Sequence, residues 1–395
     1  MNGNQQTALS GSDIPATAMT IRSIGDLFPI KKKRSYLNNA SIGPMSEPVL
    51  EAVEDFLHDV RDNGRNNYPY WCRHADTTIK NRIGRLIGAS GDEIAFTKNT
   101  TEGLGFVANG LDWREGDNVV LPDIEYPSNV YCWMNLKKRG VEIRWVKNRD
   151  GYVPLDAIRD AITPRTRLIS LSPVQFSNGF RQDLALISQL CAERGVLLNL
   201  DAIQWIGALR MDVSQHRINF MSAGGHKWLL APIGTGFFYC NSESLNQLAP
   251  PTVGYHTVDK GEAHLDYELI YRPGAGRFEE ALVNFPGIWG LDAAVKLQLA
   301  VGTMEIERHI LDLTAYAADA LQRLGCRIAS PMSEQARSGL LSFTVPNADG
   351  EQIEARLRDE AVDIAVRDGR LRASPSFFND AGDIDRLVSV IADSL

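Results

Sequence analysis

The chain has 395 residues, of which 44% are hydrophobic and 23% are charged, with 33 glycines and 18 prolines. At roughly 150 residues per domain, this length fits two compact units or one large unit with an appendage, and the average composition argues against a disordered, fibrous or disulfide-stapled protein. A formal net charge of −8 repels phosphate backbones, so we expect no nucleic-acid partner.

The five cysteines are scattered without a C-x-x-C pair. Their odd number suits a reducing compartment and their spacing offers no metal site. No apolar run approaches the ~20 residues that span a bilayer, and the first residues lack the order of a secretory signal. We therefore expect a cytoplasmic protein with no metal and no membrane partner, and a mobile polar segment at residues 1–24.

Apolar segments alternate with helical periods through the middle of the chain, which predicts the strands and crossover helices of a mostly parallel sheet. A helix is expected near Glu47–Val60, and Asp183 is the expected N-cap of another helix that ends at Gly195. The expected strands are Asn118–Leu121, Val141–Val146, Arg167–Ser172, Val196–Leu200 and Gly234–Tyr239.

Beyond about residue 290 this rhythm changes. The expected elements there are a long helix around Asp292–Thr314, a strand at Leu340–Val345, a helix at Gln352–Glu360, a strand-like segment at Ile364–Ala373 and a closing helix from Ile384. We therefore place a large domain at residues 25–290, whose first residues are expected to pack on the other domain, and a small α+β domain at residues 291–395.

The densest cluster of reactive residues lies between residues 197 and 236. Asp201 ends a mostly apolar run, which places its carboxylate at the carboxyl edge of a buried strand, where open α/β sheets bind ligands. Gln204 follows, and Phe220–Gly225 leads into His226 and Lys227. A lysine among apolar residues is desolvated, which lowers its pKa and makes its amine a nucleophile toward an aldehyde. With an acid placed to pair with a pyridine nitrogen, this is the arrangement that pyridoxal phosphate enzymes need; each residue alone fits an ordinary surface or turn position.

The D-x-x-Q motif followed by H-K-W resembles the class V aminotransferase and cysteine desulfurase family, whose members are fold type I pyridoxal phosphate enzymes. The resemblance covers roughly residues 35–395. It implies that Lys227 binds the cofactor covalently, that Asp201 pairs with the pyridine nitrogen, that Gln204 contacts the ring hydroxyl and that His226 helps to hold the phosphate. It also implies an amino-acid substrate.

Two further segments fit this resemblance. The family's T-T-E-G phosphate motif occurs here, which implies that Thr100 and Thr101 bind phosphate; a helix N-terminus with hydroxyl groups suits an anion, and a plain helix cap is the alternative. Asp123–Trp133 resembles the segment that stacks a side chain on the cofactor ring. It carries Tyr126 where desulfurases and related lyases commonly have histidine, and we expect Tyr126 to be catalytic; a core tyrosine is the alternative.

The segment Gly369–Asn379 resembles the one in which an arginine clamps the substrate carboxylate, a bidentate contact that suits guanidinium. Arg372 is the match and Arg370 is its rival. A desulfurase needs a nucleophilic cysteine in a loop shortly before this position, and none follows Cys326. We therefore expect no persulfide chemistry.

Several positions depart from the family's pattern. Gly224 stands where a phosphate-binding serine is common, with Ser222 as a candidate replacement, and Gln175 is the candidate for the usual ring-hydroxyl asparagine. Arg277–Gly287 resembles a loop that reaches the phosphate in the neighbouring subunit, with Leu282 in place of the usual threonine. The loop implies a homodimer with shared active sites.

These features lead us to expect an enzyme that removes the Cα proton of an amino acid, with Lys227 as the base. Tyr126 and the segments 36–41 and 174–180 are similar to the isopenicillin N epimerase and ergothioneine C–S lyase branch. This favours a C–S lyase or epimerase-like member and not a cysteine desulfurase. A class V aminotransferase is the alternative, and a non-catalytic cofactor-binding regulatory protein is the second; the presence of both Lys227 and Asp201 argues against the latter.

Overall fold

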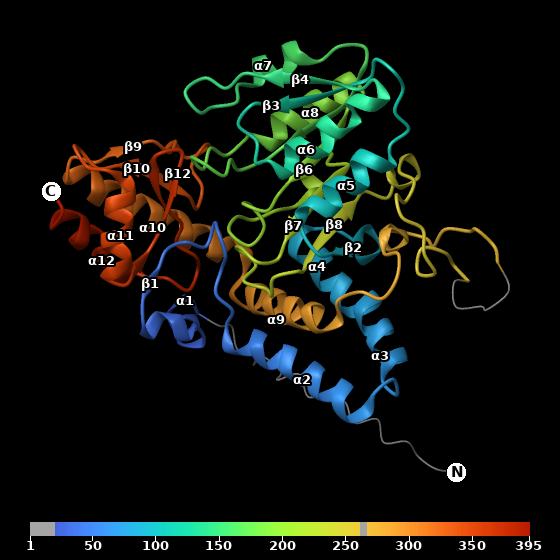
Figure 1. Ribbon diagram of the computed structural model, residues 1–395, viewed down its shortest axis with the longest axis horizontal. Coiled ribbons are helices and arrows are strands. Elements are labelled where there is room, and N and C mark those ends of the chain that lie inside the picture. The colour runs from blue at the N-terminus through green and yellow to red at the C-terminus, as the bar shows by residue number, and fades with distance from the viewer. Residues whose placement is uncertain (1–19, 261–266) are drawn as a thin grey trace.

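The computed structural model describes residues 20–260 and 267–395, and the centre of the described part is a seven-stranded sheet (Figure 1). In spatial order its strands are β2 (Ile94–Thr97), β8 (Gly236–Cys240), β7 (Phe220–Gly224), β6 (Leu197–Asp201), β5 (Thr166–Leu171), β3 (Asn118–Pro122) and β4 (Glu142–Val146). The pairs from β7 to β4 are parallel, and β8 is antiparallel to both of its neighbours. The expected mostly parallel sheet is confirmed.

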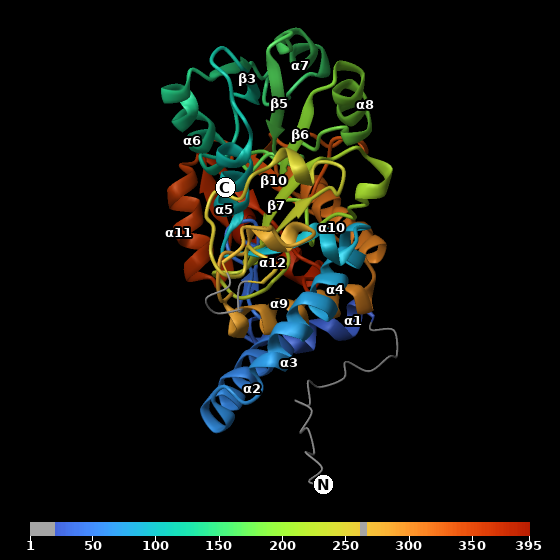
Figure 2. The same ribbon diagram turned by 90° about the vertical axis from the view of Figure 1, so that its right-hand side faces the viewer.

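Helices cover both faces of this sheet. The helices α5 (Thr100–Gly110) and α6 (Ser128–Met134) lie on one side, and α7 (Leu155–Ala161) and α8 (Leu184–Arg194) lie on the other (Figure 2). Because successive side chains of a strand point to opposite faces, Val119 packs with the aromatic residues of α5 and α6 whereas Val120 belongs to the core that contains α8.

The caps of α8 explain why its bounds could be predicted. The Asp183 carboxylate accepts a hydrogen bond from the Leu186 N–H, and Gly195 ends the helix in the left-handed conformation at φ 63°. An acceptor at the N-cap and a glycine after the last turn are the two strongest local signals of helix ends.

The N-terminal helices lie at one end of the large sheet (Figures 1 and 2). They are α2 (Glu47–Asn63), α3 (Tyr68–Arg73) and α4 (Lys80–Ile87), and α2 and α4 pack along α9 (Phe285–Val301), whereas the short helix α1 (Ile21–Ile24) lies beside the C-terminal part. Residues 1–19 of the segment expected to be mobile lie outside the described residues, whereas Ile24 is buried in the main core. No helix of the described residues is long and apolar enough to cross a membrane.

The prediction of one long helix around Asp292–Thr314 is wrong, because the structure has two helices there, α9 and α10 (Thr303–Arg323). Gly302 separates them at φ 94°, a conformation that a right-handed helix does not contain. Both helices bury apolar side chains, so the hydrophobic pattern continues across the break and does not reveal it.

The C-terminal part contains a four-stranded antiparallel sheet with its own core. Its elements are β9 (Arg327–Ile328), β10 (Leu341–Thr344), α11 (Gly350–Asp359), β12 (Ala365–Arg367), β13 (Arg370–Ala373) and α12 (Ala381–Ala392). The strand-like segment Ile364–Ala373 is therefore a hairpin. Its turn residues Asp368 and Gly369 have φ of 51° and 69°, as a two-residue turn of this kind requires.

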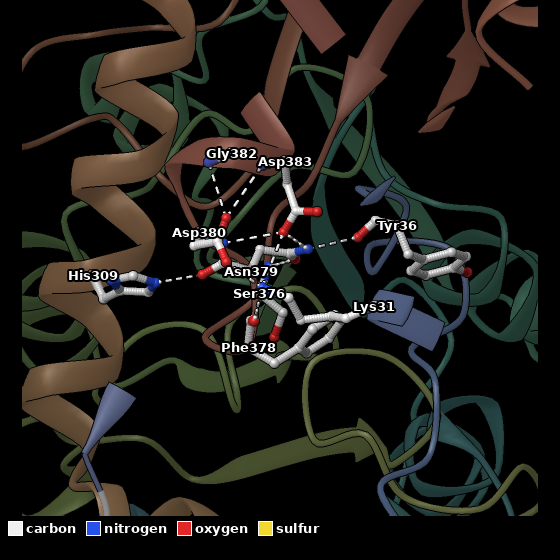
Figure 3. A network of polar contacts seen from close by, with 9 residues as sticks. All are labelled: Lys31, Tyr36, His309, Ser376, Phe378, Asn379, Asp380, Gly382 and Asp383. Carbon is white, nitrogen blue, oxygen red and sulfur yellow. Dashed lines mark hydrogen bonds and ion pairs between the residues drawn. The ribbon is translucent and has the colours of Figure 1, made fainter. Parts of the chain in front are cut away.

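Residues that precede α2 pack on this C-terminal part. Strand β1 (Ser35–Tyr36) pairs in parallel with β11 (Val362–Asp363). The Lys31 ammonium lies 2.5 Å from a carboxylate oxygen of Asp380, and the Asn379 side chain donates to the Tyr36 carbonyl at 3.1 Å; Figure 3 shows the network around these residues. These contacts direct the following residues, 37–43, between the two sheets.

Candidate active site

The side chains that the sequence singled out converge at the carboxyl edge of the large sheet. Asp201 is the last residue of β6, Lys227 follows β7, and Tyr126 follows β3. The start of α5 follows β2, which runs in the same direction as β7 because both are antiparallel to β8. The site thus lies where open α/β sheets commonly bind ligands.

Lys227 and Asp201 form a buried pair of titratable groups. Their side chains belong to residues that are 9% and 2% exposed, respectively. Burial lowers the pKa of Lys227 to about 8, although the Asp201 charge opposes this effect. Burial likewise raises the pKa of Asp201 to about 7, and the nearby Glu125 adds to this rise whereas Lys227 opposes it.

Both groups of this pair lack the partners that buried charges usually have. The Asp201 carboxylate accepts one long hydrogen bond, from the Ile203 N–H at 3.3 Å. The Lys227 ammonium forms no hydrogen bond or ion pair within residues 20–260 and 267–395. A carboxylate short of donors and an uncommitted amine fit a ligand with a protonated ring nitrogen and an aldehyde, so the residues present suit pyridoxal phosphate.

The residues around Lys227 hold its backbone tightly. The Gly43 N–H donates to the His226 carbonyl at 2.8 Å, and a Cβ at Gly43 would lie 2.3 Å from the Lys227 carbonyl oxygen. Gln204 accepts from the Trp228 indole N–H at 2.8 Å and donates to the Ala40 carbonyl at 3.1 Å. Gln204 therefore links the loop of Lys227 to residues 37–43, and its expected contact with a cofactor hydroxyl stays a prediction.

Tyr126 lies over the lysine. Its ring centroid is 5.5 Å from the Lys227 Nζ atom, and an edge-on contact with Phe176, at 5.2 Å between centroids, holds the ring. Tyr126 is 44% exposed, so one part of the ring remains accessible above the amine. A ligand attached to Lys227 would therefore have the Tyr126 ring next to it.

Glu125 is a buried acid to which the sequence analysis assigned no role. Its carboxylate accepts hydrogen bonds from the Ser172 N–H at 2.8 Å, the Ser172 hydroxyl, the Asn129 amide at 3.0 Å and the Gln175 amide at 2.8 Å. Burial raises the pKa of Glu125, although these four hydrogen bonds act to lower it. The side-chain oxygen of Gln175 is buried without a partner, so this network has a free acceptor next to the Tyr126 segment.

The residues expected to bind phosphate have different surroundings. The Thr100 hydroxyl is buried and accepts from the Gly224 N–H at 2.9 Å, whereas Thr101 donates to the Ser128 hydroxyl at the exposed start of α5. Asn99 caps that helix. His226 is half-buried, and burial lowers its pKa. Thr101 is thus more accessible than Thr100, and both contacts with phosphate stay predictions.

Ser222 has a buried hydroxyl without a hydrogen-bond partner. A Cβ at Gly103 would lie 2.4 Å from this hydroxyl, so the glycine of α5 leaves room for it. Gly224, which stands where serine is common in the family, lies against His226 and Ile203. Because Ser222 is 0% exposed beneath α5, its role as the replacement stays a prediction.

Arg372 is 1% exposed and forms no ion pair with a carboxylate of the described residues. Its guanidinium donates to the Phe176 carbonyl at 2.6 Å and to the Ser41 hydroxyl at 3.0 Å, and its Nε atom has no partner. Burial lowers its pKa to about 10, and the Arg367 charge adds to this. A buried cation that lacks an anion fits the expected role of Arg372 in binding a substrate carboxylate, and Ser41 and Phe176, which the sequence analysis gave no role, orient it.

The segment 277–287 lies beside the start of α5. Together with Lys98 and Gly234, it lines a cavity of about 210 Å³, and Asn284 caps α9 by accepting from the Gly287 N–H. Leu282 is 59% exposed on this segment. An exposed leucine that lines a surface cavity is what a contact with another subunit would cover.

The fold and this site define an α/β enzyme of fold type I that uses pyridoxal phosphate. The model of the family "Aminotransferase class-V" matches residues 35–382, and the chain belongs to that family.

Relatives support the same family. A "Probable cysteine desulfurase" of Methanothermobacter thermautotrophicus is 33% identical over 360 residues, which is 88% of this chain and 87% of the relative. A protein of the same name from Pyrococcus abyssi is 28% identical over 88% of this chain and 87% of its own. Among solved structures, a C-DES mutant with glycine covalently linked to its cofactor has a TM-score of 0.87 at 24% identity, over 93% of this chain and 98% of that one.

The names of these relatives contradict the expectation that the chain is not a cysteine desulfurase. That expectation rested on the lack of a cysteine after Cys326. A thiol of another molecule can also accept sulfur, so the missing side chain does not exclude the reaction. The comparisons show the family, and the narrower branch named from the sequence stays a prediction.

Proposed function

We propose that Lys227 carries pyridoxal phosphate and that Asp201 pairs with the cofactor's ring nitrogen. The observation that carries this proposal is the buried, uncommitted pair of Lys227 and Asp201 at the carboxyl edge of the sheet. When bound, the cofactor supplies an electron sink for charge that develops at the substrate's Cα. A positively charged ring nitrogen would supply the partner that the Asp201 carboxylate lacks.

In this proposal the remaining residues bind the phosphate and the ring hydroxyl of the cofactor and the carboxylate of the substrate. Thr101, His226 and Ser222 bind phosphate, with Thr100 holding the end of β7, and Gln204 and Gln175 lie toward the ring hydroxyl. Arg372 binds the substrate carboxylate. The neutral Lys227 amine removes the Cα proton, and the Tyr126 hydroxyl moves a proton to or from the substrate's sulfur.

We propose removal of sulfur from L-cysteine as the reaction, with L-alanine as the carbon product. The names of the relatives support this reaction, and the lone buried guanidinium of Arg372 supports an amino acid as substrate. Reducing conditions would suit the five cysteines, all of which are free, and this supports a cytoplasmic location.

The test is product analysis. Purified holoenzyme is incubated with L-cysteine and a small thiol, and alanine, pyruvate and ammonia are measured. We expect alanine without stoichiometric ammonia; pyruvate with ammonia, or transfer of the amino group to a keto acid, would overturn the proposed reaction.

The cofactor assignment has its own test. After borohydride reduction, peptide mapping should place the pyridoxyl group on Lys227. The variant Lys227→Ala should lose the label, and the exposed-lysine control Lys98→Ala should keep it. A label on another lysine would overturn the assignment.

We further propose a homodimer whose active sites are shared. Exposed apolar side chains gather around the cavity beside residues 277–287, which supports this assembly. They are Ile233, Tyr255 and Leu282. The Asn284 side chain donates to the Gly234 carbonyl, and Gly254 lies against Glu280, so the segments that carry Ile233 and Tyr255 both contact residues 277–287.

A further inference from the structure

Removal of sulfur from cysteine needs a thiolate that accepts it, because the thiolate and not the thiol is the nucleophile. The chain's own cysteines do not suit this role. Burial raises the pKa of Cys132, Cys191 and Cys240 to about 12 and also raises that of Cys326. Cys72 packs against the main core. Cys191, Cys240 and Cys326 are also buried, and the Cys132 thiol donates to the Ser128 carbonyl at 3.3 Å, so an acceptor from outside the chain fits best.

The hairpin of β12 and β13 carries arginines beside the site. In its register Ala365 faces Arg372 and Arg367 faces Arg370. Directly opposed residues of an antiparallel pair lie on the same face, so the three arginines share one face of the hairpin. Their exposure increases along it, from the buried Arg372 through the half-buried Arg370 to the exposed Arg367.

The outer arginines form no ion pair within residues 20–260 and 267–395, although the Asp368 carboxylate lies in the turn between them. Arg367 donates to the Val366 carbonyl at 2.7 Å. The Arg367 charge nevertheless reaches the site: besides burial, Arg372 and Arg367 both lower the pKa of Lys227. The short turn at Asp368–Gly369 leaves no additional loop between these arginines and solvent.

We propose that Arg367 and Arg370 bind the carboxylate of a small external thiol, which accepts the sulfur removed from L-cysteine. This inference rests on the proposed desulfurase function. Arg372 holds the carboxylate of the amino acid deeper in the site, so the outer pair remains for a second anion.

The transfer balances without an oxidant or a reductant. The thiolate attacks the sulfur of cysteine, an S–S bond forms, and the Cβ–S bond breaks with its electron pair left on Cβ. Cβ then takes up one proton, and the cysteine thiol has given up one proton, so the number of protons is unchanged. L-Cysteine and a thiolate thus give L-alanine and a persulfide anion.

The first experiment compares acceptors that differ in charge. Alanine formation by the holoenzyme is measured at saturating L-cysteine with 3-mercaptopropionate, 2-mercaptoethanol and cysteamine, and each kcat/KM is corrected for the fraction of thiolate. We expect mercaptopropionate to exceed mercaptoethanol roughly threefold to tenfold, as one or two charge-assisted contacts permit, and cysteamine to be the poorest.

Variants connect this preference with the hairpin. Arg367→Ala should bring the mercaptopropionate-to-mercaptoethanol ratio toward one, and Arg367→Lys should retain part of it. Arg356→Ala, which removes an exposed arginine of α11, should keep the ratio. Equal values for the two thiols in the unmodified enzyme, or an unchanged ratio in Arg367→Ala, would overturn the proposal.

A binding measurement separates this inference from the proposed function. Holoenzyme saturated with L-alanine, which occupies Arg372, is titrated calorimetrically with 3-mercaptopropionate and with mercaptoethanol. We expect binding of the anionic thiol that weakens in Arg367→Ala, and no such binding would overturn the inference. If the holoenzyme forms no alanine from L-cysteine with any of the three thiols, the desulfurase function itself is overturned, whatever the calorimetry shows.

Discussion

Lys227 is buried beside Asp201, and this environment determines when its amine reacts. Only the neutral amine attacks an aldehyde. Because burial lowers the pKa of Lys227 from 10.5 to about 8, the rate at which the apoenzyme reacts with pyridoxal should rise with a midpoint near pH 8. In Asp201→Asn the neighbouring negative charge is lost, so the midpoint should move to lower pH.

Stopped-flow absorbance of the apoenzyme mixed with pyridoxal measures this midpoint. Asp156→Asn, which removes a surface carboxylate that pairs with Arg149, is the matched control and should leave it unchanged. A midpoint near pH 10.5, or one that Asp201→Asn does not move, would show that the pair does not control the amine.

Tyr126 contributes a ring and a hydroxyl, and a single substitution separates them. Tyr126→Phe keeps the ring over Lys227 and should keep the visible absorbance of the bound cofactor. If the hydroxyl moves a proton during cleavage, turnover should fall by roughly 10²-fold or more. The exposed Tyr152→Phe is the control. Unchanged turnover in Tyr126→Phe would leave Tyr126 with a covering role alone.

The positions of Asp201 and Lys227 could be predicted because each follows a short apolar strand, and strand ends of one sheet meet at one edge. The environment of Glu125 could not. Its partners Ser172 and Gln175 lie 47 and 50 residues away in the sequence, and the pairing of β3 with β5 brings them together. Contacts between loops of different strands leave no periodic signal in the chain.

At the scale of elements, Gly302 offers a test whose sign depends on the fold. In a continuous helix, replacing glycine by alanine stabilises by roughly 0.5–1 kcal/mol. Gly302 instead has φ 94°, and no atom lies within 4 Å of its Cβ position. Gly302→Ala should therefore lower the free energy of unfolding by about 1 kcal/mol through backbone strain alone.

Urea unfolding of the holoenzyme, followed by circular dichroism, measures this change. Gly105→Ala is the matched control, because Gly105 lies inside α5 with only the Asn109 side chain near its Cβ position, at 3.9 Å. It should stabilise the protein slightly. Stabilisation by Gly302→Ala would indicate one continuous helix.

The hairpin at Asp368–Gly369 had a sequence signal that the strand-like prediction did not use. An Asp-Gly pair between alternating residues is the strongest short-range indication of a two-residue turn. Once the turn is recognised, the shared face of Arg367, Arg370 and Arg372 follows from the period of two. The end of α9 lacked such a signal, because a single glycine within an apolar pattern also occurs inside helices.

At the scale of the molecule, the large sheet could be predicted because its buried parallel strands are short apolar runs separated by helices. The pairing of β1 with β11 could not, because it joins residues 35–36 to 362–363. That pairing matters for the site: it directs residues 37–43 to where Ser41 contacts Arg372 and Gly43 contacts the loop of Lys227.

The exposed apolar surface around residues 277–287 predicts a dimer in solution. Leu282 and Ile233 are 59% and 70% exposed, and single-chain proteins rarely leave such residues gathered on one surface. Light scattering should give twice the mass of one chain. Leu282→Asp should shift the protein toward the monomer, because a charge would be buried without a partner at the two-fold contact.

The same variant should also release the cofactor more readily if the segment reaches the partner's site, which gel filtration followed by absorbance measures. Met304→Asp is the matched control, since Met304 is equally exposed but lies on α10, away from this surface. It should change neither mass nor cofactor retention. A monomer that holds the cofactor tightly would show that each site is complete within one chain. The segment 277–287 would then have no role in binding a partner's phosphate.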